Sequence, residues 1–290
     1  MNAFSKLHPF ALLIYFAAVL SAAMFINNPV IQLISLVGAV LFCLTGGGRK
    51  RDFLFYLPLM LLVMLTNPLV SHNGITPLFY LGGNAVTLEA IVYGAVLAVM
   101  IAAVMLWFRA FGAVMTSEKT MFLFGKVIPK LSLVVTVAMR YVPLLKRRAT
   151  AVSRSVKASG IYSSESVSDR LKSAGAQTSA LIGWSLENAV ETSKAMKARG
   201  YGLKGRRNYS DFRFRKSDFA FLLICIALWV AVMAGSAAGA LDFEFYPEIP
   251  PLPSGAFSVV CYAAYAVMAF LPFIIEAEEM IRWKYYRSGI

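Results

Sequence analysis

Two tripeptides, each at the end of a predicted helix, hold the residues best suited to chemistry with a partner. One is Ala198-Arg199-Gly200 and the other is Ala158-Ser159-Gly160. An arginine guanidinium can make bidentate, charge-assisted hydrogen bonds with a carboxylate, and small flanking residues let two backbones approach closely. Serine offers a single neutral hydroxyl. From the tripeptide alone, a helix C-cap with a solvated arginine is the simpler interpretation, and a docking contact is the alternative.

The rest of the chain lacks the patterns of catalytic and metal sites. His8 and His72 lie at or beyond the ends of apolar stretches, and no HExxH, GxSxG or paired-carboxylate arrangement occurs. Cys43, Cys225 and Cys261 lie singly inside apolar runs. Ionisable residues at mid-membrane depth, which transporters use to move protons or hold ions, are essentially missing. The sequence therefore predicts no catalytic residue, no metal site and no cofactor, so any energy that the protein uses must arrive through another protein.

Composition places the chain in a membrane. Of its 290 residues 59% are hydrophobic and only 15% are charged, and the mean hydropathy is +0.67. The formal charge of +13 is concentrated between Arg140 and Lys216, where 17 Lys/Arg stand against 5 Asp/Glu, a net of +12. Such a segment is typical of the cytoplasmic side and suits anionic lipid headgroups. Interleaved aromatic residues are scarce there, which argues against a nucleic-acid partner.

The apolar pattern predicts an all-α membrane protein: a bundle of about six transmembrane helices and a cytoplasmic pair of long amphipathic helices. The loops over residues 71–87 and 241–255 contain no Lys or Arg and are expected outside, which leaves both termini in the cytoplasm of a plasma-membrane protein. We expect three parts: transmembrane helices in 1–111, a cytoplasmic or interfacial module in 112–216, and further transmembrane helices with a tail in 217–290. The predicted spans are Phe10–Ile26, Val30–Thr45, Phe53–Val70, Glu89–Phe111, Phe219–Ala240 and Ala256–Ile275.

Small residues recur within two of these spans. Gly94, Ala98 and Ala102 are four residues apart, and Gly235 and Gly239 have GxxxG spacing. Internal packing of the bundle and a face for a partner helix are both open interpretations of the first set.

The two amphipathic helices of the basic module end at the tripeptides. The first begins at Pro129 and carries an apolar stripe, with Arg140, Arg147 and Arg154 on a separate face; Pro143 must kink or break it. The second begins near Asp169, the predicted N-cap. The apolar stripe consists of Val134, Ala138, Tyr141, Leu145, Ala149, Val152 and Val156.

The second helix also carries a family signature. From Ser185 to Gly202 the chain reads SLENAVETSKAMKARGYG, which resembles the signature of the transmembrane T component of energy-coupling factor (ECF) transporters. Upstream, Met139 to Pro143 is similar to the arginine-aromatic-aliphatic-proline step of that family's first coupling helix. The resemblance covers about residues 1–240, so the sixth span goes beyond the family's simplest layout.

This resemblance implies a non-enzymatic scaffold. In the family, two cytoplasmic ABC ATPases drive the T component, and it holds a small membrane protein that captures a vitamin or a metal ion. The coupling helices dock on the ATPases through Ala-Arg-Gly tips. By this likeness one tip is Ala198, Arg199 and Gly200, and the other is Ala158, Ser159 and Gly160, where serine replaces arginine and Lys157 or Arg154 would supply charge nearby. The supporting residues of the coupling helices would be Arg140, Pro143, Arg154, Lys157, Glu187 and Met196.

Two other classes of function remain open from the residues. A conventional permease would carry its own substrate path, which predicts a polar cavity within the spans. A membrane-bound enzyme or a non-transport anchoring protein would use the basic helices only to lie on anionic lipid.

Overall fold

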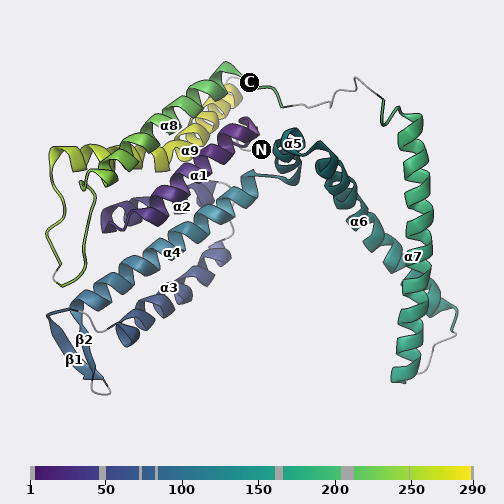
Figure 1. The fold of residues 1–290 in the computed structure, drawn as a ribbon, viewed down its shortest axis with the longest axis horizontal. Coiled ribbons are helices and arrows are strands. Elements are labelled where there is room, and N and C mark those ends of the chain that lie inside the picture. The colour runs from purple at the N-terminus through teal and green to yellow at the C-terminus, as the bar shows by residue number, and fades with distance from the viewer. Residues whose placement is uncertain are drawn as a thin grey trace. The chain divides into compact units, whose positions relative to one another are not determined.

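The computed structural model confirms an all-α membrane protein and describes residues 4–45, 50–71, 74–81, 84–160, 166–203, 212–247 and 249–288. Its contacts divide the chain into two units, residues 1–120 with 212–290, and residues 121–211. The first unit holds the apolar helices, and the second holds the two long amphipathic ones (Figure 1). A short helix, α5 (Ser117–Val127), begins in the first unit and ends in the second.

The six predicted apolar stretches all form helices in the first unit. Among the described residues three helices have the length and composition to cross a membrane, and three apolar helical segments are shorter, at 10–17 residues: Pro9–Phe25, Pro29–Thr45 and Phe55–Val70. At about 1.5 Å per residue the shorter ones reach about 26 Å or less, against a hydrocarbon core of about 30 Å. The helices are α1 (Pro9–Phe25), α2 (Pro29–Thr45), α3 (Lys50–Val70), α4 (Leu88–Val114), α8 (Lys216–Ala237) and α9 (Ala256–Ser288).

The last helix is longer than predicted. It continues from Ala256 to Ser288, past the expected end at Ile275 and through the charged stretch that follows. No glycine or proline lies between Phe273 and Ser288 to stop it. Pro272 lies inside the helix.

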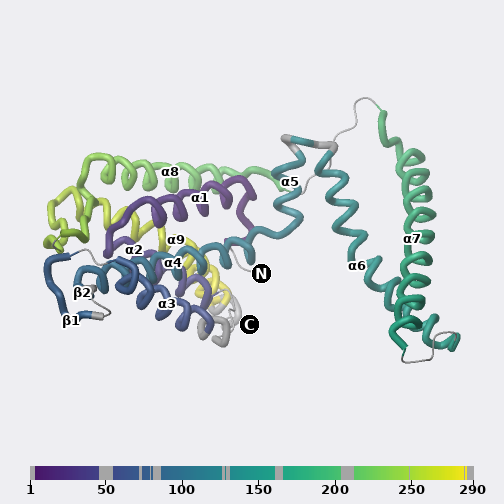
Figure 2. The backbone as a smooth tube through the Cα atoms, turned by 60° about the horizontal axis from the view of Figure 1, so that its bottom comes forward, coloured from purple at the N-terminus to yellow at the C-terminus, as the bar shows by residue number. Residues whose placement is uncertain are grey.

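Aromatic side chains form the core of the first unit. Phe4 makes edge-to-face contacts with Tyr15, Phe16 and Phe42, with ring centroids 5.4–6.1 Å apart. Buried Trp107 stacks on Phe42 and donates a hydrogen bond from Nε1 to Ser35 Oγ at 3.1 Å. These contacts join α1, α2 and α4, while α8 packs against α1 and α9, as Figure 2 shows.

Charged side chains that are buried in this unit hold helix ends together. Asp218, in the first turn of α8, accepts backbone hydrogen bonds from Arg215 at 2.9 Å and from His8 at 3.2 Å. Lys119 follows α4 and donates from Nζ to the carbonyl oxygens of Ser5 and Val114. Burial lowers the pKa of the Lys119 ammonium. Both residues therefore fix where neighbouring helices begin and end.

The small residues within the spans are used for internal packing. Gly94, Ala98 and Ala102 are all buried in α4. A Cβ atom on Gly94 would lie 2.9 Å from the backbone oxygen of Met64 and 3.0 Å from Asn67 Cβ, so this glycine lets α3 approach α4. Of the two alternatives that the sequence left open, internal packing is confirmed at Gly94.

The two glycines of the GxxxG pair at the end of α8 have different roles. A Cβ atom on Gly235 would collide with Cys261 Sγ of α9, so Gly235 is a packing glycine. Gly239 lies beyond the end of α8 with φ of 76°, in the left-handed region where glycine ends helices.

We expect Gly94→Ala to destabilise the first unit by about 1–3 kcal/mol, because the added methyl group meets backbone atoms of α3 that cannot rotate away. Gly112→Ala is the matched control, since a Cβ atom there meets nothing within 4 Å in the same helix. Thermal unfolding of the purified chain in mild detergent measures both. Equal midpoints for the two variants would contradict the packing role of Gly94.

Candidate protein-docking site

The second unit is built on the two predicted amphipathic helices. α6 (Pro129–Ala158) has proline at its first position and continues through Pro143, so the alternative that Pro143 breaks the helix is wrong. α7 (Val167–Ala198) begins after Ser166. The predicted N-cap Asp169 is also wrong: it lies in the first turn of α7, where a carboxylate is favoured by the helix dipole. The predicted serine-rich connector at residues 163–166 lies outside the described residues except for Ser166.

Both tripeptides end helices through a glycine in the left-handed region. Gly160 has φ of 66° and Gly200 has φ of 77°, conformations that a residue with a Cβ atom adopts only with strain. At the end of α7 the amide of Tyr201 donates to the carbonyl of Met196 at 2.9 Å, the hydrogen bond typical of a Schellman motif. The glycine of each tripeptide is therefore required for the turn that exposes the residue before it.

The middle residues of the two tripeptides are used differently. The Ser159 hydroxyl donates a hydrogen bond to the carbonyl of Val156 at 2.8 Å, so the hydroxyl proton is already used in a bond to the last turn of α6. Arg199 forms no hydrogen bond or ion pair with any described residue. The tip of α7 thus presents a guanidinium that no described residue engages, whereas the tip of α6 has serine at the same place.

α6 and α7 pack against each other around one tryptophan. The rings of Tyr141 in α6 and Trp184 in α7 have centroids 5.9 Å apart at an interplanar angle of 35°. Arg148, two turns further along α6, places its guanidinium carbon 5.5 Å from the centroid of the same tryptophan ring. An aromatic contact and a cation–π contact therefore hold the two helices together.

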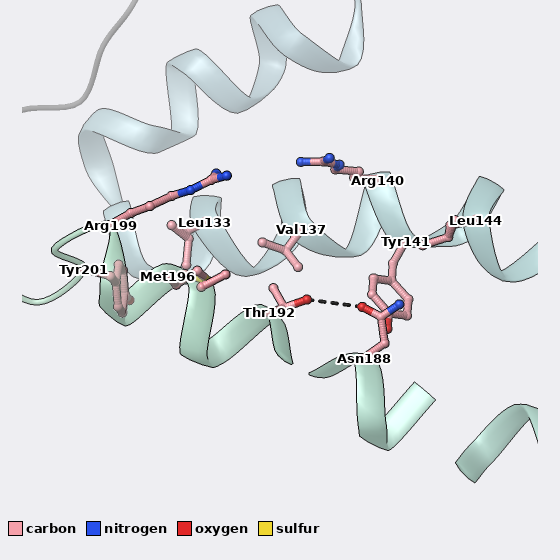
Figure 3. Close-up of a pocket in the computed structure, with 11 residues that line it drawn as sticks. Leu133, Val137, Arg140, Tyr141, Leu144, Asn188, Thr192, Met196, Arg199 and Tyr201 are labelled. Carbon is pink, nitrogen blue, oxygen red and sulfur yellow. Dashed lines mark hydrogen bonds between the residues drawn. The ribbon is translucent and has the colours of Figure 1, made fainter. Parts of the chain in front are cut away.

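A groove of about 410 Å³ lies between the helices on the side of Arg199. Figure 3 shows Arg140 of α6 and Arg199 directed toward one another across it, above apolar side chains that include Leu133, Val137 and Met196. None of its lining residues is acidic. Two guanidinium groups beside an apolar surface suit a partner segment that carries a carboxylate and an apolar face. The remaining lining residues are Tyr141, Leu144, Asn188, Thr192, Ala195 and Tyr201.

A second groove, of about 660 Å³, follows the apolar stripe of α6. Val134, Ala138 and Leu145 of the stripe line it together with Val142, and small residues of α7 face them. Val134 of the stripe and the neighbouring Val142 keep 60% and 63% of their surface exposed, so this part of the groove is left uncovered by the described residues. Lys197 is the single charged residue in its lining. The residues of α7 that line this groove include Ser185, Ala189, Thr192, Ser193 and Met196.

The structure brings together some of the predicted site residues and leaves others apart. Arg140, Met196 and Arg199 line one groove, whereas Pro143 and Glu187 line neither. Arg154 and Lys157 are exposed near the end of α6, beside Ala158, Ser159 and Gly160. This end lies about 27 Å along the helix from Arg140, at about 1.5 Å per residue. The two tips therefore cannot share one small contact.

Sequence reasoning missed the residues that join the helices. Trp184, Arg148 and the row of Leu133, Val137 and Leu144 on α6 were not predicted as contacts. One signal was present, because Trp184 is the single tryptophan between residues 112 and 216. A large aromatic residue in a helix rich in Ala and Ser indicates a packing point.

Comparisons with known proteins point to one family. A family model with the description "CbiQ: Cobalt transport protein" matches residues 2–209. A curated relative from Listeria innocua serovar 6a, "Energy-coupling factor transporter transmembrane protein EcfT", is 29% identical over 110 residues. This match covers 37% of the chain and spans 40% of that relative's length. In the part of the chain that the structure describes, no group of three or more His, Cys, Asp or Glu side chains is placed to hold a metal ion.

Proposed function

This chain belongs to the CbiQ family of cobalt transport proteins and is the T component, the energy-coupling membrane subunit, of an ECF transporter; we propose that it transmits the movement of two cytoplasmic ABC ATPases to a separate membrane protein that captures the substrate. ATP hydrolysis then takes place in the partner ATPases. The chain lies in the plasma membrane with both termini in the cytoplasm, an orientation that the basic segment from Arg140 to Lys216 supports.

The observation that carries this proposal is the set of donors at the end of α7. Arg199 is held at the helix end by the Gly200 turn, has no partner among the described residues, and faces Arg140 across an apolar groove. Two like charges that lie close together on a groove favour an anionic partner. We propose that a carboxylate of one ATPase binds between Arg199 and Arg140, while apolar ATPase side chains fill the groove below.

The tip of α6 makes a different contact. With the Ser159 hydroxyl bound to Val156, Ala158, Ser159 and Gly160 offer the second ATPase a small, neutral surface. Arg154 and Lys157 supply positive charge on the preceding turn. The two ATPases are therefore held with unequal strength, more tightly at the end of α7.

The groove along the apolar stripe suits the capture protein. Its lining is apolar or hydroxyl-bearing, with Lys197 as the single charge, as expected for contact with a hydrophobic membrane protein. Anionic lipid binds elsewhere on the basic segment. The substrate is a vitamin or a metal ion such as cobalt, and the capture protein selects it.

Reconstitution tests the proposal. The chain is purified together with the two ATPases and the capture protein that accompany it, and all are placed in liposomes with ATP on the ATPase side. We expect ATP-dependent substrate uptake that is lost when either the chain or the capture protein is left out. Uptake by the chain and ATPases without a capture protein would contradict the proposal and favour a conventional permease. Uptake driven by the capture protein without this chain would exclude a coupling role.

A further inference from the structure

A small β-hairpin joins α3 to α4, where the sequence predicts only a loop. Strands β1 (Pro77–Leu81) and β2 (Asn84–Thr87) pair antiparallel, with Phe79 opposite Val86 and Tyr80 opposite Ala85. Figure 1 shows the hairpin at the ends of α3 and α4. β2 packs against both helices, and α4 begins directly after Thr87.

The base of the hairpin is fixed by hydrogen bonds. Glu89, in the first turn of α4, accepts from the Thr76 hydroxyl at 2.6 Å and from the Thr76 amide at 3.3 Å. The Leu88 amide donates to the Thr76 carbonyl at 3.1 Å. Gly74 has φ of 135°, and a Cβ atom there would lie 2.7 Å from Thr87 Oγ1. The hairpin is therefore held in a defined position on the helix ends.

The hairpin has one covered and one uncovered apolar face. Val86 is buried, with 4% of its surface exposed. Phe79 pairs with Val86, and Leu78 and Tyr80 flank Phe79 in β1. Tyr80 is 72% exposed and Leu78 is 55% exposed. Ile75, just before the strand, is 57% exposed. A hairpin that is anchored this firmly presents these three side chains outward instead of folding them inward.

The position of the hairpin and its lack of charge indicate what covers the uncovered face. Residues 71–87 contain no Lys, Arg, Asp or Glu, although a loop in water normally carries some. α4 has 27 residues, about 40 Å at 1.5 Å per residue, so its ends reach beyond a hydrocarbon core of about 30 Å. The hairpin therefore lies at the level of the lipid headgroups, where tyrosine and apolar side chains are favoured together.

The adjoining surface of α3 supports the same assignment. Leu61, Leu65 and Leu69, four residues apart, are all more than half exposed, and Val70 at the end of the helix is 76% exposed. In a membrane this row contacts lipid. We propose that Ile75, Leu78 and Tyr80 extend the lipid contact of α3 into the interface, so that the hairpin anchors the α3–α4 ends in the headgroup layer. This inference does not depend on the ATPase docking proposed above.

Spin-label accessibility in the full-length chain tests this proposal. Tyr80→Cys and Leu78→Cys are labelled separately in nanodiscs of phosphatidylcholine and phosphatidylglycerol, and the label's exposure to oxygen and to a water-soluble nickel chelate is measured. Glu244→Cys is the matched control, because Glu244 is exposed in the loop between α8 and α9. This loop lies at the same end of the helices as the hairpin: the Tyr246 hydroxyl is 3.4 Å from the hydroxyl of Ser71, which follows α3. The native chain serves as the blank because Cys43, Cys225 and Cys261 are buried.

We expect the ratio of oxygen to nickel accessibility to be several-fold higher at positions 78 and 80 than at position 244. A ratio equal to that at position 244 would place the hairpin in water and overturn the proposal. Exclusion of both reagents would also overturn it, since a protein surface, such as a second copy of the chain, would then cover the face. Because positions 78 and 80 are exposed, the labels fit without disturbing the fold.

Discussion

We expect Arg199→Ala to weaken the binding of the proposed partner ATPases by about 30-fold to about 1,000-fold, which corresponds to about 2–4 kcal/mol for removal of an interface arginine. The reason is geometric: Arg199 stands at a fixed helix end, opposite Arg140, with no carboxylate of its own chain among the described residues to satisfy it. Titration of the purified chain with the ATPase pair in mild detergent measures the loss.

Three variants control this result. Ser159→Ala changes the affinity little, because the Ser159 hydroxyl already donates to Val156. Arg199→Lys keeps the charge but loses the planar fork, so its affinity falls between those of the native chain and Arg199→Ala. Arg140→Ala causes a smaller loss than Arg199→Ala. If Ser159→Ala weakens binding as much as Arg199→Ala, the assignment of the stronger contact to α7 is wrong.

The second large effect is expected at the contact between the coupling helices. Trp184→Ala removes both the aromatic contact with Tyr141 and the cation–π contact with Arg148, together worth about 1–3 kcal/mol. We expect this loss to loosen the contact between α6 and α7, so that less of the proposed movement at the α7 tip reaches α6. We expect ATP-dependent uptake by the reconstituted complex to fall about tenfold or more, the equivalent of about 1.4 kcal/mol.

The binding of ATPases separates this effect from simple loss of the docking tip. Trp184 lies more than three turns before Arg199 and does not line its groove, so Trp184→Ala keeps most of the ATPase affinity. Trp184→Phe retains an aromatic partner for Tyr141, and Arg148→Gln removes only the cation–π contact; both should lose less uptake. Full uptake by Trp184→Ala would show that the helices need no contact at this point.

Local signals in the sequence were enough to predict the helices and some of their ends. Apolar runs of 16 residues or more predicted all six helices of the first unit, and Gly160 and Gly200 marked the ends of α6 and α7. The hairpin was missed, although Gly82-Gly83 between two apolar runs is a recognised hairpin signal. The length of α9 was underestimated because the prediction followed the apolar span, which ends at Ile275, whereas the charged residues after it continue the helix.

Contacts between elements could not be predicted in the same way. Arg148 and Trp184 are 36 residues apart, and their contact depends on how α6 crosses α7. Likewise, the helical period placed Arg140 on a face separate from the apolar stripe, whereas the structure makes it part of the groove opposite Arg199. The family signature identified the tips and the missing arginine at Ser159, but it could not show that Arg199 has no partner among the described residues.

Purification of the native full-length chain tests the central claim most directly. The chain is isolated from its own membranes in a mild detergent that preserves complexes, and the proteins that accompany it are identified and quantified. We expect two ABC ATPase subunits for each copy of the chain, together with a small hydrophobic membrane protein. Recovery of the chain without any cassette ATPase, under conditions in which known complexes survive, would contradict its assignment as an energy-coupling subunit.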